Sequence, residues 1–288
     1  MAASARQRTA RRRARAGRIA GEAAQYAALT VAAVIILFPI YITLVYSLQP
    51  VEKIFSYPPT LYVSDPQWDT YRRAFETGSL GRYLVNSFIV SLAITTGQVA
   101  TSVMAAYAFA FLRFPFRNLL FIVFLTTLMV PWEVTIIPNY QTISTLGWLD
   151  SYQGLIVPFL ATAFGTFLLR QAFMTVPRDL RDAAAIDGYG HFGFMLQVVV
   201  PLSRAAIGAL AVFSFLLAWN QYLWPLLITN QDDYRTVQIG LKALVSSNID
   251  EFNLVMAGTV IAAAPILALL ILFQKQLIRG LTSGAIKG

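Results

Sequence analysis

The chain has 288 residues, of which 57% are hydrophobic and only 12% are charged, whereas about 25% of the residues of a soluble domain are charged. A soluble globule of this size could not bury so many apolar side chains, so the composition predicts a chain that lies in lipid. The sequence has no cysteine, which excludes disulfides and thiolate metal sites. Its one histidine, His191, leaves little material for histidine-based metal or acid–base chemistry.

The net charge of +8 is the kind of value that often indicates nucleic-acid binding. Its placement favours a membrane protein instead, because seven arginines lie within residues 1–18, directly before an apolar run at residues 27–47. A basic segment before a run long enough to span is typical of the cytoplasmic flank of a retained helix. We therefore expect a basic cytoplasmic tail at residues 1–24, a membrane-lipid environment, and no nucleic-acid partner.

Six windows of mostly apolar residues are long enough to cross about 30 Å of hydrocarbon. They lie at residues 25–47, 84–112, 119–138, 154–170, 205–229 and 254–274. The fourth window is the shortest, and Pro158 and Gly165 interrupt it. The sequence thus predicts an all-α membrane protein whose residues 25–288 form one domain with six transmembrane helices.

The distribution of basic residues predicts which side of the membrane each loop occupies. Six crossings place both termini on one side, and sixteen of the 22 Lys and Arg residues then fall on that side. Cytoplasmic loops are the ones enriched in Lys and Arg, so we expect both termini to be cytoplasmic. The polar segment at residues 49–83, with a short amphipathic stretch at 68–75, is expected on the outer face.

Prolines recur inside the predicted spans. Each one removes a backbone donor and frees the carbonyl four residues earlier, which must find a partner or face water. Many prolines in membrane helices only produce a kink, and a neighbouring helix satisfies the free carbonyl. The recurrence of proline in five of the six windows nevertheless favours a bundle that encloses a cavity. The five prolines are Pro39, Pro131, Pro158, Pro225 and Pro265.

The segment between the fourth and fifth windows predicts a short helix at the membrane surface. Pro177 suits a first helical turn, Asp179 complements the positive end of the helix dipole, and Gly188 supplies a stop. The alanines at 183–185 leave part of the helix surface nearly smooth. Small side chains of this kind allow another protein to approach closely.

The run Asp-Ala-Ala-Ala-Ile-Asp-Gly at 182–188, followed by Pro201, resembles the "EAA" loop of permease subunits of bacterial ABC importers. This resemblance implies the six-helix permease fold of type I importers, with a coupling helix in the cytoplasmic loop 171–203 that transmits the closure of an ATPase. Two departures, Asp182 for the usual glutamate and Tyr189 for the common alanine, imply altered detail in that contact. The resemblance implies a role in coupling to the ATPase for the positions that match the family's loop, which are Asp182, Ala183, Ala184, Asp187, Gly188 and Pro201.

The same resemblance implies partners. These are a sister permease subunit in a heterodimer, two ATPase subunits that bind ATP and Mg²⁺, and an extracytoplasmic solute-binding protein. The chain lacks Gly-x-x-x-x-Gly-Lys-Ser/Thr, so we expect no cofactor and no enzymatic activity in this subunit. Residues 216–228 and 279–288 are similar to the second permease subunit of carbohydrate-type importers, and residues 129–134, 149–152 and 167–171 to glycerol-3-phosphate or glycerophosphodiester permeases.

A polar and aromatic cluster near the end of the fifth window is the first candidate for contact with a solute. Its members are Trp219, Asn220, Tyr222 and Trp224, beside Gln221. Asn220 and Trp224 are four residues apart and would share one helix face. Amide and aromatic groups suit a hydroxylated solute, although a belt of aromatic residues at the membrane boundary needs no ligand.

Glu133 is the one acid within a predicted span, and an ionisable group there indicates function by default. It could line the path or lie in water at the outer end of its helix. No Lys or Arg lies deep in any window, so a phosphate-bearing solute would find no buried cation in this chain.

Two other functions fit a helical membrane protein. A secondary transporter of a small polar solute also uses broken helices, but usually carries coupled charges within its spans. A regulatory or assembly protein needs only the helices. The coupling loop argues against both and favours the permease subunit of an ATP-driven importer of a small polar solute in the inner membrane.

Overall fold

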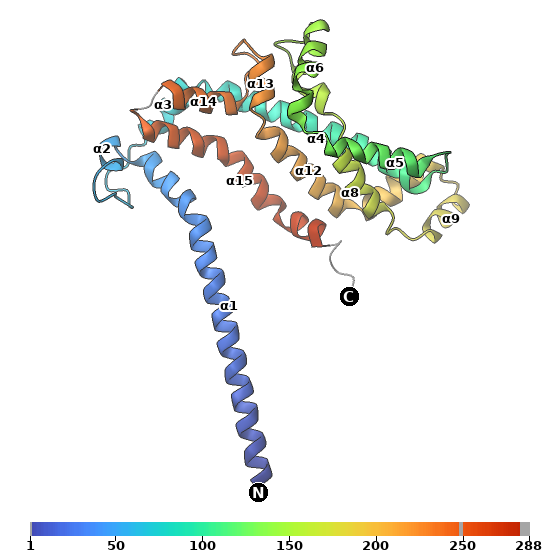
Figure 1. The fold of residues 1–288 in the computed structure, drawn as a ribbon, viewed down its shortest axis with the longest axis horizontal. Helices are drawn as coiled ribbons and strands as arrows, with labels where there is room; N and C mark the ends of the chain where they lie inside the picture. The colour runs from blue at the N-terminus through green and yellow to red at the C-terminus, as the bar shows by residue number, and fades with distance from the viewer. Residues whose placement is uncertain (1, 248–249, 283–288) are drawn as a thin grey trace.

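The computed structural model describes residues 2–247 and 250–282, and within these ranges every regular element is a helix (Figure 1). Three helices are long and apolar enough to cross a membrane: α1 (Ala2–Leu48), α4 (Leu80–Phe111) and α15 (Phe252–Thr282). Pro39 and Pro265 lie inside α1 and α15 without interrupting either helix. These three elements match the first, second and sixth windows predicted from the sequence.

Three further pairs of helices pass the same length and hydropathy criteria but are bent. The segment formed by α5 (Arg117–Thr126) and η1 (Thr127–Met129) meets α6 (Trp132–Thr145) at 95°. That formed by α7 (Tyr152–Ile156) and η2 (Val157–Phe159) meets α8 (Ala163–Phe173) at 45°. The third joins α10 (His191–Phe194), η3 (Met195–Val199) and α11 (Val200–Leu202) to α12 (Arg204–Trp219) at 81°. Counting each bent pair as one span gives up to six within the described residues.

The prolines explain why three predicted windows are broken rather than continuous. Pro131 caps the start of α6, and Pro158 lies in η2. Pro225 lies in α13 (Leu223–Ile228), which is separated from α12 by a break at residues 220–222. The expectation that Asn220 and Trp224 share one helix face is therefore wrong, because no continuous helix connects them.

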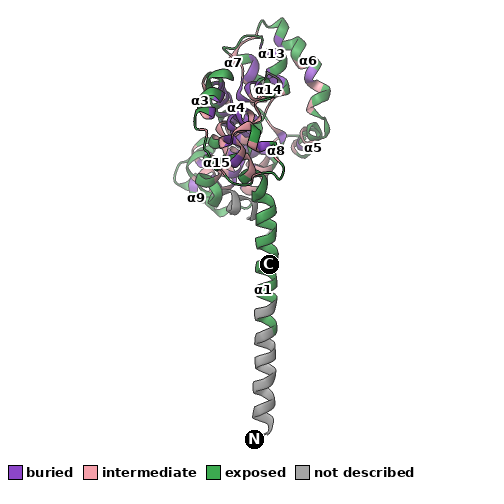
Figure 2. Cartoon of the chain, turned by 90° about the vertical axis from the view of Figure 1, so that its left-hand side faces the viewer, coloured by how far each residue is buried: buried purple, intermediate pink, exposed green. Residues whose placement is uncertain are grey.

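Helix α12 lies at the centre of the fold and packs against α4, α8 and α15. Buried residues of α12 cluster with those of these neighbouring helices, and Figure 2 shows buried segments concentrated in the body of the bundle around α4, α8 and α15. Helix α1 extends away from the bundle and packs mainly against α15. Only 6% of the residues in its most apolar window are buried, so most of its apolar surface is available to lipid or another protein.

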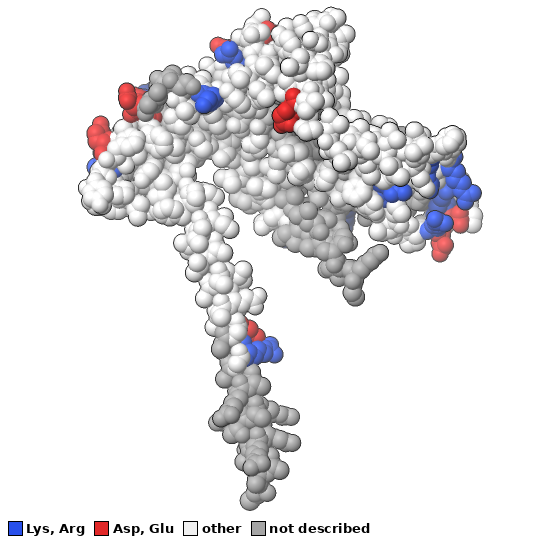
Figure 3. Space-filling model, viewed as in Figure 1, with Lys and Arg blue, Asp and Glu red and all other residues white. Residues whose placement is uncertain are grey.

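The remaining short helices lie at the two ends of the bundle. Helices α2 (Val51–Ile54), α3 (Asp69–Thr77) and α14 (Val237–Ser247) are at one end, and α9 (Asp179–Ile186) is at the other (Figure 1). Charged side chains gather mainly over these two ends, with a largely uncharged surface between them (Figure 3). This distribution suits a molecule whose middle lies in hydrocarbon.

Candidate functional site

A cavity of about 470 Å³ lies where the interrupted helices converge. The wall is formed by the middle of α4, the start of α6, the turn between η2 and α8, and the break between α12 and α13. Helix breaks expose backbone groups that only a cavity or a neighbouring helix can satisfy in lipid. The cavity thus lies where helices are interrupted, and one of the prolines noted in the sequence, Pro158, belongs to its lining.

Side chains of α4 hold the turn that separates η2 from α8. Gln98 Nε2 donates to the Phe159 carbonyl at 2.8 Å, and Thr101 Oγ1 donates to the Leu160 carbonyl at 2.8 Å. These bonds satisfy carbonyl oxygens that the broken helix leaves without a helical donor. The turn is consequently fixed at the cavity wall.

Two polar atoms at the cavity have no partner of their own. Gln221 Oε1 and Ser214 Oγ are buried, and neither makes a hydrogen bond within the described part of the chain. A buried polar group without a partner costs about 1–3 kcal/mol. A hydroxylated solute or water in the cavity would remove that cost.

Three aromatic rings form one side of the cavity. The ring centroid of Trp132 lies 4.7 Å from that of Phe159 and 5.6 Å from that of Trp224. Trp224 is fixed in place because its Nε1 donates to the Gly154 carbonyl at 3.0 Å. The rings offer a flat apolar surface beside the amide and hydroxyl groups, which is how sites for polar organic ligands are commonly built.

Two helices begin at this cavity. Helix α6 starts at Trp132, and α8 starts at Ala163, directly after the lining residues Ala161 and Thr162. The Thr162 side chain makes no capping hydrogen bond. The positive ends of these two helix dipoles therefore lie next to the cavity, which favours a negatively charged group there. The lining contains no Lys, Arg, Asp or Glu.

Only some of the residues that the sequence predicts to form the solute path lie at the cavity. Tyr222 and Trp224 line the cavity. Trp219 is only 1% exposed, and its Nε1 donates to the Ala262 carbonyl of α15 at 3.2 Å. Asn220 is exposed and donates to the Leu216 carbonyl, and Glu133 is exposed in the first turn of α6. Neither belongs to the cavity lining.

The sequence reasoning missed several residues of the cavity. Gln98 and Trp132 reach it, as do Thr162 and Ser214. Gln98 carried a usable signal, because it is a long polar side chain inside an apolar window. Thr162 had one as well, since it lies between the two interruptions at Pro158 and Gly165.

Helix α9 forms where the sequence predicts a short helix. The Leu180 amide donates to the Pro177 carbonyl, and the helix ends before Gly188, whose φ is +84°. The Tyr189 amide closes the end by donating to the Ala184 carbonyl at 2.9 Å. Asp179 lies in the first turn, as expected.

The three alanines of α9 lie on different faces of the helix, so that only part of its exposed surface is formed by alanine. Ala184 is 5% exposed and packs in a buried cluster with Tyr107 and Phe194. Ala183 and Ala185 are exposed. Since one face of α9 packs on the bundle, only the opposite face is available for docking.

The other positions expected in the coupling loop are distributed over neighbouring elements. Asp182 lies in α9, Asp187 is its C-terminal cap, and Pro201 lies in α11. Arg181 Nη1 donates to the Phe111 carbonyl at 3.2 Å, which attaches α9 to the end of α4. The loop is thereby linked to a membrane-spanning helix.

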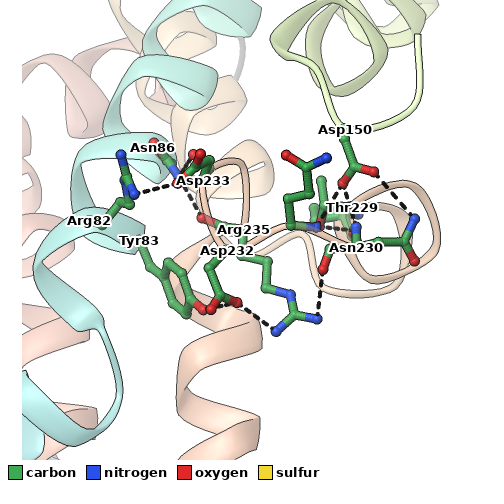
Figure 4. A network of polar contacts seen from close by, with 11 residues as sticks. Arg82, Tyr83, Asn86, Asp150, Thr229, Asn230, Asp232, Asp233 and Arg235 are labelled. Atoms are coloured by element: carbon green, nitrogen blue, oxygen red, sulfur yellow. Dashed lines mark hydrogen bonds and ion pairs between the residues drawn. The ribbon is translucent and has the colours of Figure 1, made fainter. Parts of the chain in front are cut away.

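A polar network at the opposite end fixes the loop between α13 and α14 (Figure 4). Asn86 Nδ2 donates to the carbonyls of Asp233 and Arg235 at 2.8 and 2.9 Å, and Tyr83 donates to Asp232 at 2.8 Å. Arg82 forms an ion pair with Asp233. The loop is thus held to α4.

Asp150 holds the same loop from the other side. Its carboxylate accepts hydrogen bonds from the amides of Asn230 and Gln231 (Figure 4). Partial burial alone would raise the Asp150 pKa, but these amide donors outweigh it and leave the pKa below its ordinary value. The carboxylate is therefore ionised at neutral pH and its hydrogen bonds are charge-assisted.

A family model described as "binding-protein-dependent transport system inner membrane component" matches residues 98–283. The sn-glycerol-3-phosphate transport system permease protein UgpE of Yersinia enterocolitica is 40% identical over 261 residues, which cover 88% of this chain and 93% of the relative. UgpE of Brucella abortus is 41% identical over 257 residues, covering 86% and 91%.

Two solved structures share the fold. A chain of a bacterial ABC transporter involved in the import of the acidic polysaccharide alginate has a TM-score of 0.77 at 20% identity, with 87% of this chain and 94% of that chain covered. A chain of bacterial alginate ABC transporter in complex with alginate pentasaccharide-bound periplasmic protein has a TM-score of 0.62 at 12% identity, with 86% and 91% covered.

Proposed function

Because this chain belongs to the family of binding-protein-dependent transport system inner membrane components, we propose that its cavity forms part of the path taken by the solute of an ABC importer. The chain is a permease subunit in the inner membrane, which disfavours the secondary-transporter alternative. The observation that carries the proposal is the buried, unpartnered Gln221 Oε1 at a cavity where three helices are broken.

We propose a solute of the glycerol phosphate class. The similar permeases of Yersinia enterocolitica and Brucella abortus are named for sn-glycerol-3-phosphate. The amide and hydroxyl groups of the cavity suit the glycerol hydroxyls, and the starts of α6 and α8 suit the phosphate. No lysine or arginine lines the cavity, so under this proposal the sister subunit supplies the cation that pairs with the phosphate.

The partner subunits are part of the same proposal. A sister permease completes the path, two ATPase subunits bind ATP and Mg²⁺, and an extracytoplasmic binding protein delivers the solute. Both termini and α9 lie on the cytoplasmic side. The exposed face of α9, which includes Ala183, docks in an ATPase, while the buried Ala184 transmits the movement to the bundle.

The remaining coupling positions act through geometry. Asp182 and Asp187 present charge at the two ends of α9, and Gly188 provides the left-handed turn that ends it. Pro201 stiffens the connection into α12. Trp219 supports the path from behind by attaching α12 to α15, whereas Tyr222 and Trp224 face the solute. Asn220 and Glu133 reach it only if the path extends beyond the cavity.

The test is a Gln221→Leu substitution in the complete transporter, reconstituted with its partner subunits and binding protein. Leucine keeps the volume and removes the hydrogen bond, so uptake of labelled sn-glycerol 3-phosphate should fall about tenfold, the equivalent of roughly 1.4 kcal/mol. The matched control is Gln141→Leu, an exposed glutamine of α6 outside the cavity. Uptake by Gln221→Leu equal to that of the control would exclude this cavity as the path.

The solute is identified separately. Calorimetry of the partner binding protein with sn-glycerol 3-phosphate, a glycerophosphodiester and a neutral sugar should give tight binding for the first or second. Tight binding of the neutral sugar alone would contradict the assigned solute class. Uptake should also require ATP and persist when ion gradients are dissipated.

A further inference from the structure

A second cavity, of about 720 Å³, lies at the end of the bundle that carries α9. It is bounded by the turn between α4 and α5, the end of α8, and the start of α9. Five arginines and one acid, Asp182, contribute to its wall. The arginines are Arg113, Arg117, Arg170, Arg178 and Arg181.

None of these five arginines forms an ion pair with a carboxylate in the described ranges 2–247 and 250–282. Three of them are held by the backbone instead. Arg117 donates to the Leu112 carbonyl at 3.1 Å and Arg181 to the Phe111 carbonyl at 3.2 Å. Arg170 donates to the Phe109 carbonyl at 3.4 Å and lies over the Phe121 ring, 4.2 Å from its centroid.

Five guanidinium groups and a single carboxylate, that of Asp182, leave an excess of positive charge around this cavity. Arg117 and Arg170 line the same cavity, and Arg170 is partly removed from water, so their like charges repel each other. A phosphate would offset it, because guanidinium groups match phosphate oxygens in pairs of charge-assisted hydrogen bonds. The backbone contacts fix the arginines in advance, which lowers the entropy lost on binding.

The rim of the cavity is apolar. Phe116 is 73% exposed and Leu119 is 57% exposed, and both line the cavity. Helix α5 continues this exposed apolar surface through Ile122 and Val123 into the membrane-spanning part. A cationic cavity that opens onto an apolar helix face fits an amphiphile better than a small soluble ion. Basic pockets at the ends of membrane helices commonly hold lipid head groups.

We propose that this cavity binds the phosphate of an anionic phospholipid, whose acyl chains lie along the exposed face of α5. The basic side chains gather at this end of the molecule in Figure 3. The head group would bridge the α4–α5 turn and α9, because arginines of both segments line the same cavity. Binding does not depend on the solute assigned above, so it can fail or succeed independently of that assignment.

The experiment uses the complete transporter in nanodiscs that contain phosphatidylcholine with a minor fraction of phosphatidylglycerol. Native mass spectrometry measures how much phosphatidylglycerol remains bound to this subunit. Arg113→Gln/Arg117→Gln should weaken retention on the order of tenfold, since it removes two donors to the phosphate. The matched control is Arg204→Gln/Lys275→Gln, which removes the same charge outside the cavity lining.

Three outcomes would overturn the proposal. Equal retention by the variant and the control would mean that the cavity does not select the lipid. Loss of the ATPase subunit from the purified variant complex would identify the arginines as a protein-docking site. The third outcome comes from a separate measurement, in which inorganic phosphate is added to the transporter in discs of pure phosphatidylcholine. If phosphate raises the unfolding temperature as much as phosphatidylglycerol does, the cavity binds free phosphate.

Discussion

Asp150 is a residue whose conformation and charge act together. Its φ of +48° lies in the left-handed region, which aspartate tolerates better than most residues. This conformation turns the chain so that the carboxylate meets the amides of Asn230 and Gln231. One short side chain therefore connects the α6–α7 turn to the loop that precedes α14.

The lowered Asp150 pKa predicts how this link depends on pH. The folded state binds the proton more weakly than the unfolded state, so the stabilisation is complete above the ordinary pKa of 3.8 and is lost as the pH falls through the lower folded value. Asp150→Asn should reduce stability by about 1–2 kcal/mol at neutral pH. In thermal unfolding of the purified complex, the gap between wild type and variant should close on acidification; a constant gap would contradict this role.

The residue-level predictions succeeded or failed according to where the helix breaks. Trp219 and Trp224 are similar in sequence context, yet one packs on α15 and the other faces the cavity. Their separation follows from the break at residues 220–222. Pro225 indicated that a break exists, but the direction in which the chain leaves it depends on contacts such as that from Trp224 to Gly154, which are remote in sequence.

At the scale of elements, hydropathy located the apolar segments well. Helices α1, α4 and α15 were predictable because each contains one unbroken apolar run, which in α1 follows the basic segment. The 95° bend before α6 was not, since the composition of residues 117–145 is the same for a straight and a bent helix. Helix α9 was predictable in outline because its start and stop residues are local signals, whereas the burial of Ala184 depends on Tyr107 and Phe194.

The contact between α4 and α8 depends on Gly165. A Cβ at this position would lie 2.4 Å from Ser102 Oγ and 2.8 Å from Thr162 Cγ2. Gly165→Ala should therefore push the helices apart and lower stability by about 1–3 kcal/mol, measured as a lower unfolding temperature of the purified complex. Gly21→Ala is the control, because a Cβ there meets nothing within 4 Å. Equal unfolding temperatures would show that the helices do not pack this closely.

The two faces of α9 should respond differently to substitution. Ala183→Glu changes the exposed docking face, so ATP hydrolysis should become independent of solute while the subunit remains folded. Ala184→Glu places a charge in a buried cluster and should lower the yield of folded subunit, because burying an unpaired charge costs several kcal/mol. The ratio of uptake to hydrolysis and the amount of folded protein distinguish the two; identical behaviour would contradict the proposed docking face.

At the scale of the whole molecule, charged side chains are most concentrated at the two ends of the bundle, and few lie on the face between them (Figure 3). The excess of basic residues near the chain termini and α9 predicts which end faces the cytoplasm. The sequence supplied this prediction directly, since it depends on counting rather than on packing. The packing of α1 against α15 could not be predicted from the sequence, because no local pattern specifies which spans are neighbours.

The absence of native cysteine allows a direct test of this orientation. Asp65 lies between α2 and α3, Ala185 lies in α9, and both are exposed. Because α3 and α9 are at opposite ends of the bundle (Figure 1), the single variants Asp65→Cys and Ala185→Cys each place a thiol at a different end. A membrane-impermeant maleimide should label Asp65→Cys in intact spheroplasts and Ala185→Cys only in inverted vesicles. The cysteine-free parent gives the background. Labelling of Ala185→Cys from outside would reverse the orientation and remove the docking role of α9.

The pairing of α1 with α15 has a consequence for biosynthesis. Helix α1 ends at Leu48 and α15 begins at Phe252, so the ribosome must synthesise all the intervening residues before these two helices can associate. During that interval, lipid or insertion factors must cover the apolar surface of α1 in the bilayer. Nascent chains stopped before residue 252 would leave α1 without its main packing partner, which gives quality-control proteases a means of recognising unfinished copies.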